Sequence, residues 1–76
     1  MKFLDLVELI NEKSEYSKVG VKKGCFGAVM SEEKINGKWL VVFSEFYTGK
    51  DIAEILVNED DLMIHERVPK DKYPKI

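Results

Sequence analysis

The fold is decided by residues 27–46, which read GAVMSEEKINGKWLVVFSEF. The pair Asn36-Gly37 divides two runs that are rich in apolar residues. A two-residue turn between paired strands needs positive φ at both positions, and Asn and Gly are the residues that tolerate it best. The stretch therefore predicts a β-hairpin with arms at residues 27–32 and 38–46.

Alternation in the second arm separates its two faces. Trp39, Val41 and Phe43 share one face, and we expect this face to point into the core because it carries the largest side chains. The opposite face begins with Leu40 and Val42, which are also apolar. Both faces of this strand are therefore expected to be covered, at least in part.

Downstream of the hairpin, the sequence predicts two further strands joined by one helical turn. The apolar run 52–57 has the length and polar boundaries of a strand. Asn58 is a suitable cap for a short 3-10 turn at residues 58–61, whose acidic side chains suit the positive start of a helical turn. Alternation then indicates a half-buried strand at residues 62–68, and residues 69–76 are expected to be a loosely held tail.

The N-terminal segment fits two structures. Apolar residues recur with helical spacing at positions 3, 6, 7 and 10, whereas the alternation over residues 5–9 fits a strand. No good N-cap residue precedes the segment, so periodicity alone leaves helix and strand open.

The order of these segments resembles that of the small SH3-like barrels, in particular short bacterial KOW-like proteins of an uncharacterised family. The resemblance covers most of the chain and rests on a first strand at residues 5–9, a long loop, the segment 21–29 (VKKGCFGAV), the hairpin, and the acidic turn 59–62 (EDDL). In such barrels, glycines such as Gly24 and Gly27 allow the loop to reverse sharply and the next strand to bend across the core.

This resemblance implies a strand rather than a helix at residues 4–11. The expected fold is then mainly β: a single small domain over residues 1–76, built as a five-stranded antiparallel barrel with one short 3-10 turn. The alternative is an α+β domain with an N-terminal helix at residues 3–13. The family offers a fold and no established activity.

Composition excludes several classes of protein. With 76 residues, 45% of them hydrophobic and 34% charged, the chain has the length and composition of one ordinary globular domain. No apolar run approaches the roughly 20 residues that a membrane-spanning helix needs. The lone Cys25 cannot form an internal disulfide, and no apolar leader segment is recognisable, so we expect a cytoplasmic protein.

No pattern of catalytic or metal-ligating residues is recognisable. Cys25 and His65 belong to no nucleophile–base motif, and His65, which alternates with Leu62 and Ile64, is expected at the surface. Three adjacent carboxylates at residues 59–61 lack the spacing and the glycine of a calcium loop. The sequence therefore predicts no enzyme, no cofactor, no metal site and no small-molecule substrate.

Apolar residues on both faces of two strands are the best functional indication. Either the N-terminal segment and the tail cover the outer set, or the outer set recruits another protein or a second copy of the chain. Residues 45–61 also carry one lysine against six acidic residues, a net charge of −5 that suits a basic partner. We therefore predict a non-catalytic protein–protein interaction module, in the manner of an immunity or antitoxin protein that accompanies a larger effector. The predicted partner-binding residues are Leu40, Val42, Phe46, Tyr47, Ile52 and Leu56.

The alternative function is that of a KOW-like nucleic-acid-binding domain. Basic residues in the long loop and the tail, with Tyr16 and Tyr73 nearby, would supply charge and stacking surface. The net charge of −2 disfavours this alternative, because it supplies no general attraction to phosphate. The residues that would carry it are Lys18, Lys22, Lys23, Arg67 and Lys70.

Overall fold

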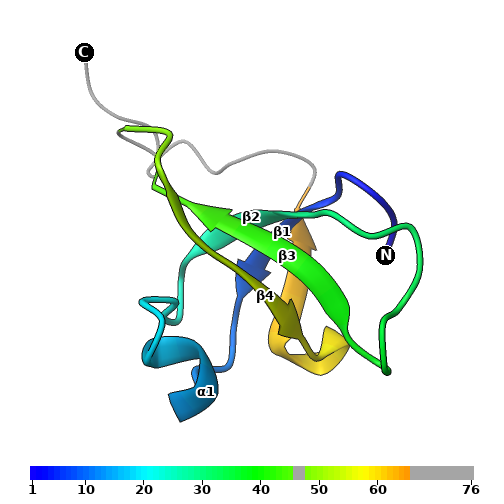
Figure 1. The fold of residues 1–76 in the computed structure, drawn as a ribbon, viewed down its shortest axis with the longest axis horizontal. Helices are drawn as coiled ribbons and strands as arrows, with labels where there is room; N and C mark the ends of the chain where they lie inside the picture. Colours follow the sequence, from blue (N-terminus) through cyan, green and yellow to red (C-terminus); the bar gives the residue numbers. More distant parts are fainter. Residues whose placement is uncertain (46–47, 66–76) are drawn as a thin grey trace.

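The computed structural model describes residues 1–45 and 48–65, and this part of the chain is mainly β (Figure 1). Five strands, one turn of α-helix and one 3-10 turn follow one another in the described residues. In chain order they are β1 (Leu6–Leu9), α1 (Ser14–Ser17), β2 (Phe26–Val29), β3 (Trp39–Ser44), β4 (Asp51–Val57), η1 (Glu59–Asp61) and β5 (Leu62–His65).

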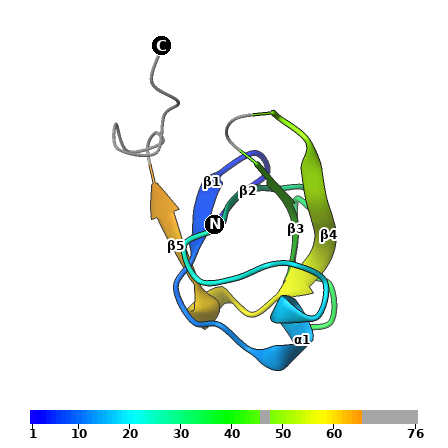
Figure 2. The same cartoon turned by 90° about the vertical axis from the view of Figure 1, so that its left-hand side faces the viewer.

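All five strands belong to one antiparallel sheet with the order β4-β3-β2-β1-β5. The sheet curves strongly, so that β4 and β5 lie on opposite sides of the curve (Figure 2). Within the described residues these two strands form the edges of the sheet, and the sheet is open rather than closed. The prediction of a mainly β, five-stranded antiparallel fold with one 3-10 turn is therefore confirmed.

The hairpin between β2 and β3 has the predicted turn. Asn36 has φ 53° and Gly37 has φ 79°, so both central residues are left-handed. The Ile35 amide donates to the Lys38 carbonyl over 2.7 Å, and the Lys38 amide donates back over 3.1 Å. The turn is therefore the two-residue type that Asn-Gly favours.

The N-terminal segment is a strand, and the alternative of a helix at residues 3–13 is wrong. Val7 and Leu9 are buried and alternate with half-buried neighbours. β1 pairs with β2 on one side and β5 on the other, so tertiary pairing decides between two structures that local periodicity left open. The only α-helix among the described residues is the turn α1, at Ser14–Ser17 inside the loop after β1.

The core lies on the concave side of the sheet and is closed by α1. Trp39, Val41 and Phe43 point inward as predicted, and Trp39 is 6% exposed. Tyr16 brings α1 into this core, which the sequence analysis did not anticipate. The buried cluster comprises Val7, Leu9, Tyr16, Val21, Val29, Trp39, Val41, Phe43, Val57 and Leu62.

Two glycines have the roles expected from the sequence. Gly24 has φ 94°, a left-handed conformation that ends the long loop before β2. A Cβ on Gly27 would lie 2.5 Å from the carbonyl oxygen of Val42, so only glycine permits the close approach of β2 to β3.

The register of β4 corrects one predicted orientation. A shift between Phe43 and Ser44 pairs Ala53 with Phe43 and Asp51 with Ser44, which leaves Ile52 outside the alternation. Ile52 packs against the buried core instead of pointing outward. The predicted outward orientation of Ile52 is therefore wrong.

The C-terminal end of the described chain differs from the expected alternation. Leu62 is buried, but Ile64 is 51% exposed and His65 is half-buried. Asn58 occupies the N-cap position of η1 without a side-chain cap bond. The end of the predicted strand at residues 62–68 and the predicted tail at residues 69–76 lie outside the described residues.

Candidate functional site

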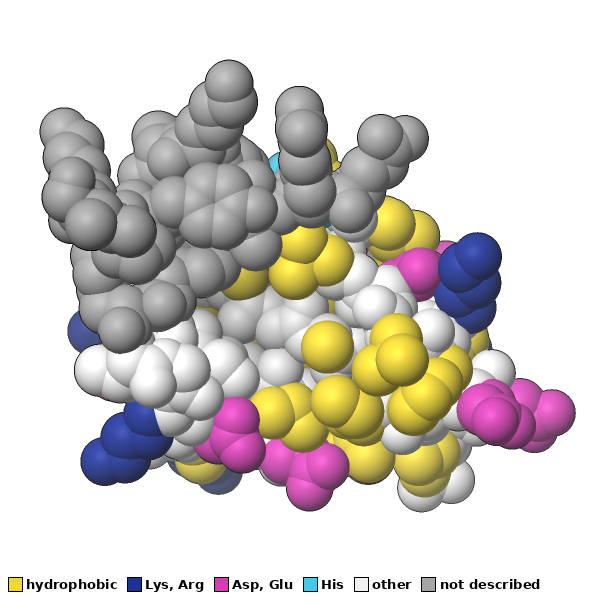
Figure 3. All heavy atoms as spheres, turned by 90° about the horizontal axis from the view of Figure 1, so that it is seen from above, with side chains coloured by type: hydrophobic (Ala, Val, Ile, Leu, Met, Phe, Trp, Pro, Cys, Tyr) yellow, Lys and Arg dark blue, Asp and Glu magenta, His cyan; other side chains and the backbone are white. Residues whose placement is uncertain are grey.

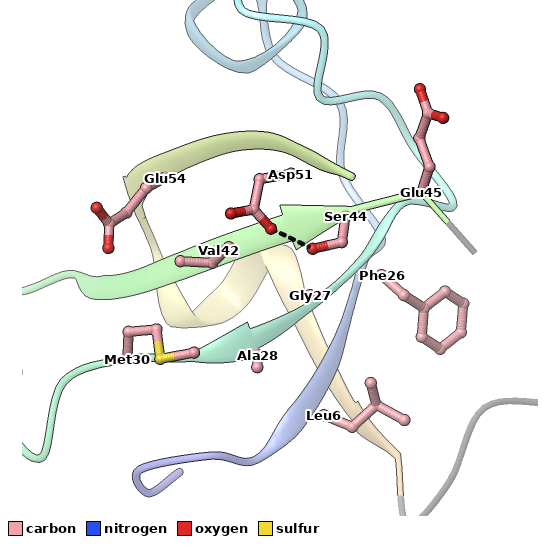
Figure 4. A pocket seen from close by; sticks show the side chains of 10 residues that line it. All are labelled: Leu6, Phe26, Gly27, Ala28, Met30, Val42, Ser44, Glu45, Asp51 and Glu54. Atoms are coloured by element: carbon pink, nitrogen blue, oxygen red, sulfur yellow. Dashed lines mark hydrogen bonds between the residues drawn. The ribbon is translucent and has the colours of Figure 1, made fainter. Parts of the chain in front are cut away.

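A groove of about 660 Å³ lies on the outer face of the sheet, the face opposite the buried core. Figure 3 looks down on the molecule from above, where apolar side chains gather with acidic side chains along their border. Four neighbouring strands, the residue that follows β2 and the residue that follows β3 supply the lining (Figure 4). The lining residues are Leu6, Phe26, Gly27, Ala28, Met30, Val42, Ser44, Glu45, Asp51 and Glu54.

Strand register builds this groove. Leu6 pairs with Ala28, Ala28 pairs with Val42, and Val42 pairs with Glu54. Directly paired residues share a face of a sheet, so these four form one row across β1, β2, β3 and β4. The small side chain of Ala28 leaves a hollow between Leu6 and Val42, and Met30 borders the hollow from the end of β2.

The β4 side of the groove is acidic. Ser44 donates a hydrogen bond from its hydroxyl to Asp51 over 3.0 Å, and the Thr48 hydroxyl donates to Glu45 over 3.1 Å. Among residues 1–45 and 48–65, no ion pair reaches Glu45, Asp51 or Glu54. Within residues 1–45 and 48–65, no lysine or arginine lines the groove. The groove therefore combines an apolar row with a negatively charged border.

The predicted partner-binding residues are only partly assembled here. Val42 lines the groove, while Leu40 and Leu56 pair with each other on the same outer face and are half-buried. Phe46 and Tyr47 lie outside the described residues.

Sequence analysis missed the contribution of β1 and β2 to this face. Leu6, Ala28 and Met30 line the groove beside Val42. The alternation at residues 6–9 and 26–29 contains this information, because Val7, Leu9 and Val29 must point inward. The alternation can be interpreted in this way only once β1 is known to be a strand paired with β2.

A second polar cluster lies around Asp61, on η1. This carboxylate is 3% exposed, and it accepts a hydrogen bond from the Tyr16 hydroxyl over 2.7 Å. Lys13 forms an ion pair with it over 2.8 Å, and the Asn11 amide donates to its other oxygen over 3.3 Å. The backbone N–H of Asn58 donates in turn to the Tyr16 hydroxyl over 3.3 Å. The cluster therefore ties the loop after β1 to the 3-10 turn.

The charge states of this cluster follow from these contacts. Burial opposes ionisation of Asp61, but hydrogen bonds from Lys13, Tyr16 and Asn11 outweigh it and hold its pKa below the usual value. Burial, and then the bond to Asp61, raise the pKa of the Tyr16 phenol. Every polar atom of the buried carboxylate thus has a partner, and this cluster has the properties of a structural clamp.

The acidic segment 45–61 therefore divides between two roles. Glu45, Asp51 and Glu54 border the groove. By contrast, Asp61 is buried in the clamp, and Glu59 accepts a hydrogen bond from the Trp39 indole over 2.9 Å. That bond, followed by the charge of Lys34, lowers the pKa of Glu59.

The three described lysines of the nucleic-acid alternative do not lie beside the aromatic side chain that was expected to accompany them, Tyr16. Lys18, Lys22 and Lys23 are exposed in the loop after α1. Tyr16, which was expected to lie beside them as a stacking surface, is 1% exposed and belongs to the core. Arg67 and Lys70 lie outside the described residues.

His65 and Cys25 are engaged in separate contacts. The Nε2 atom of His65 lies 2.8 Å from Oε1 of Glu8, and the centroids of the His65 and Phe26 rings lie 4.9 Å apart. The Cys25 sulfur accepts a hydrogen bond from the Lys22 amide over 3.4 Å. The described residues contain no group of three His, Cys, Asp or Glu that would hold a metal ion. No helix in the same residues is long and apolar enough to cross a membrane.

Comparison of the chain with protein-family models, with curated proteins and with solved structures found no match.

Proposed function

We propose that this chain is a non-catalytic protein–protein interaction module whose partner binds in the groove on the outer face of the sheet. The observation that carries the proposal is the row from Leu6 through Ala28 and Val42 to Glu54, which places apolar side chains beside a carboxylate that forms no ion pair with any described residue. Removing apolar surface from water supplies the binding free energy, and the charged border selects the partner.

The strand order supports a structural part of the same proposal. β1 lies between β2 and β5, and a 3-10 turn joins β4 to β5. This arrangement is the one expected of a small SH3-like barrel of the KOW-like kind, and we propose that the chain adopts that fold. A cytoplasmic immunity- or antitoxin-like protein, which covers a basic surface of a larger effector, would use such a groove.

The nucleic-acid alternative has less support. The hollowed surface is bordered by Glu45, Asp51 and Glu54, which repel phosphate, and the exposed lysines at 18, 22 and 23 have no described aromatic side chain to stack on a base.

The decisive experiment places a charge in the groove. Val42→Lys introduces an ammonium group at a half-buried position, and Ile64→Lys is the matched control at an exposed apolar residue away from the groove. The immobilised wild-type chain and both variants are tested for retention of a partner from lysate of the source organism. We expect the wild type and Ile64→Lys to retain the same partner and Val42→Lys to lose it.

Circular dichroism and sedimentation accompany the capture experiment. A folded Val42→Lys variant that still retains the partner would contradict binding through the groove. Loss of a self-associated species in the same variant would identify the partner as a second copy of the chain.

A further inference from the structure

The groove also specifies the chemistry of its occupant, and this inference rests on the proposed function. We infer that the partner is another protein that inserts an apolar side chain over Ala28 and places a lysine or arginine against Asp51 and Glu54. The segment it contributes is thus both basic and apolar. Shape, strand register and charge each contribute to this assignment.

The shape of the groove locates the apolar anchor. Ala28 lies between Leu6 and Val42 in the same row, so the smallest side chain stands between two larger ones (Figure 4). Gly27 precedes it and lines the groove with backbone atoms alone, because it pairs with Val7 and Phe43 of the inward face and has no side chain. The hollow therefore has backbone and one methyl group at its base, and it fits a branched or linear aliphatic side chain.

Strand register fixes the distance from this anchor to the charge. Glu54 lies two strands from Ala28, by way of Val42. At about 4.8 Å per strand, the separation is roughly 10 Å across the sheet. An extended segment rises about 3.3 Å per residue, and a lysine or arginine side chain adds several ångströms of reach. A basic residue two or three positions from the anchor therefore reaches the carboxylates.

The sign of the partner's charge follows from the missing counter-charge. Glu45, Asp51 and Glu54 border the groove, and no cation of the described residues pairs with them. Ser44 orients Asp51 by donating to one oxygen. A guanidinium of the partner can donate hydrogen bonds to the remaining acceptor positions of Asp51. A carboxylate of the partner in the same place would be repelled by three negative charges.

A second copy of the chain fits this groove less well. The exposed lysines at 18, 22 and 23 belong to the loop after α1 and do not line the groove. Docking them into another copy's groove joins two different surfaces head to tail, and such contacts propagate into open chains unless the rotation closes.

The test uses three fluorescein-labelled nonapeptides and the full chain. The probes are three repeats of Lys-Leu-Gly, of Glu-Leu-Gly and of Lys-Ser-Gly, which separate the charge from the apolar anchor. Fluorescence anisotropy is expected to show tighter binding of Lys-Leu-Gly than of either other peptide. Equal binding of Lys-Leu-Gly and Glu-Leu-Gly would overturn the assigned charge, and equal binding of Lys-Leu-Gly and Lys-Ser-Gly would overturn the anchor.

Neutralising variants identify the carboxylates. The double variant Asp51→Asn/Glu54→Gln removes two charges from the border, and Glu32→Gln/Glu33→Gln removes two from an exposed loop as the matched control. Two exposed charge pairs of about 0.5 kcal/mol each correspond to about fivefold weaker binding of Lys-Leu-Gly by the first variant. The control is expected to bind like the wild type. Equal effects of the two variants would overturn the assignment to Asp51 and Glu54.

Two outcomes separate this inference from the function on which it rests. If Val42→Lys loses the captured partner while Asp51→Asn/Glu54→Gln retains it unchanged, the groove binds a partner but the inferred charge is wrong. If Val42→Lys also retains the partner, the proposed function itself fails. Arg67→Glu/Lys70→Glu in the full chain should leave the affinity for Lys-Leu-Gly unchanged. An increase would assign the groove to the chain's own C-terminal residues and overturn the inference.

Discussion

The Tyr16 hydroxyl donates a hydrogen bond to the buried Asp61 carboxylate over 2.7 Å, across 45 positions of sequence. The donor lies on the single turn α1, and the acceptor lies on η1. A four-residue helix has little stability of its own. This bond, together with burial of the Tyr16 ring in the core, holds the loop after β1 against the end of the sheet.

Removing the Tyr16 hydroxyl should destabilise the domain without emptying the core. Tyr16→Phe retains the ring but deprives Asp61 of a donor and the backbone N–H of Asn58 of an acceptor. We expect the free energy of unfolding to fall by about 1 to 3 kcal/mol, because the lost bond involves a buried charged group. Urea unfolding measures the change. The control Ser17→Ala, at a half-buried neighbour, should change it by far less, and equal stability of Tyr16→Phe and wild type would contradict the clamp.

Acid should weaken the same clamp. The folded pKa of Asp61 lies below its usual value, so ionised Asp61 contributes stability that is present above the unfolded pKa of about 3.9 and is lost as pH falls through the folded pKa. Urea midpoints of the wild type should therefore drop between about pH 5 and pH 2. Asp61→Asn should be less stable at neutral pH and should show a shallower drop. Parallel curves for the two proteins would assign the acid sensitivity to other carboxylates.

Trp39 should dominate the stability of the core. Its indole is 6% exposed, and its nitrogen donates to Glu59 over 2.9 Å. Trp39→Ala should cost about 3 to 5 kcal/mol, a large part of the roughly 4 to 11 kcal/mol expected of a domain this size. Trp39→Phe retains much of the packing and should cost less. A cooperative thermal melt of Trp39→Ala close to that of the wild type would show that the inward face of β3 is assigned wrongly.

The elements that were predictable from the sequence are those whose cause is local. Asn36 and Gly37 adopt the positive φ angles that the turn requires, so two residues are enough to predict it. Alternation over residues 39–43 identifies the inward face of β3. Ile52 was assigned wrongly because a register shift between Phe43 and Ser44 depends on how two strands pair, not on β4 alone. Whether residues 6–9 form a strand or a helix likewise depended on pairing with β2 and β5.

The candidate site was predictable only in part, for the same reason. Val42 was identified from its own strand, but the hollow beside it exists because register places Ala28 next to it. The acidic residues were visible in the sequence as one charged segment. Their division into a groove border and a buried clamp depends on Tyr16, which lies 45 positions from Asp61.

Nucleic acid should bind weakly or not at all. The reason is the placement of the three lysines of the loop after α1. Lys18, Lys22 and Lys23 are exposed, but Tyr16 is buried and the net charge of the chain is −2. If all three lysines contacted phosphates of duplex DNA, log K would fall by about 2.7 for each tenfold rise in salt, so any complex formed at low salt should dissociate near physiological salt. Fluorescence anisotropy with a labelled duplex and a labelled single strand, in low and physiological salt, measures this.

Lys22→Glu/Lys23→Glu should abolish the low-salt signal, whereas Lys34→Glu, a lysine outside this loop that pairs with Glu59, should leave most of it. Sub-micromolar affinity that survives physiological salt would reverse the ranking of the two functions, because so few phosphate contacts cannot supply it without base stacking.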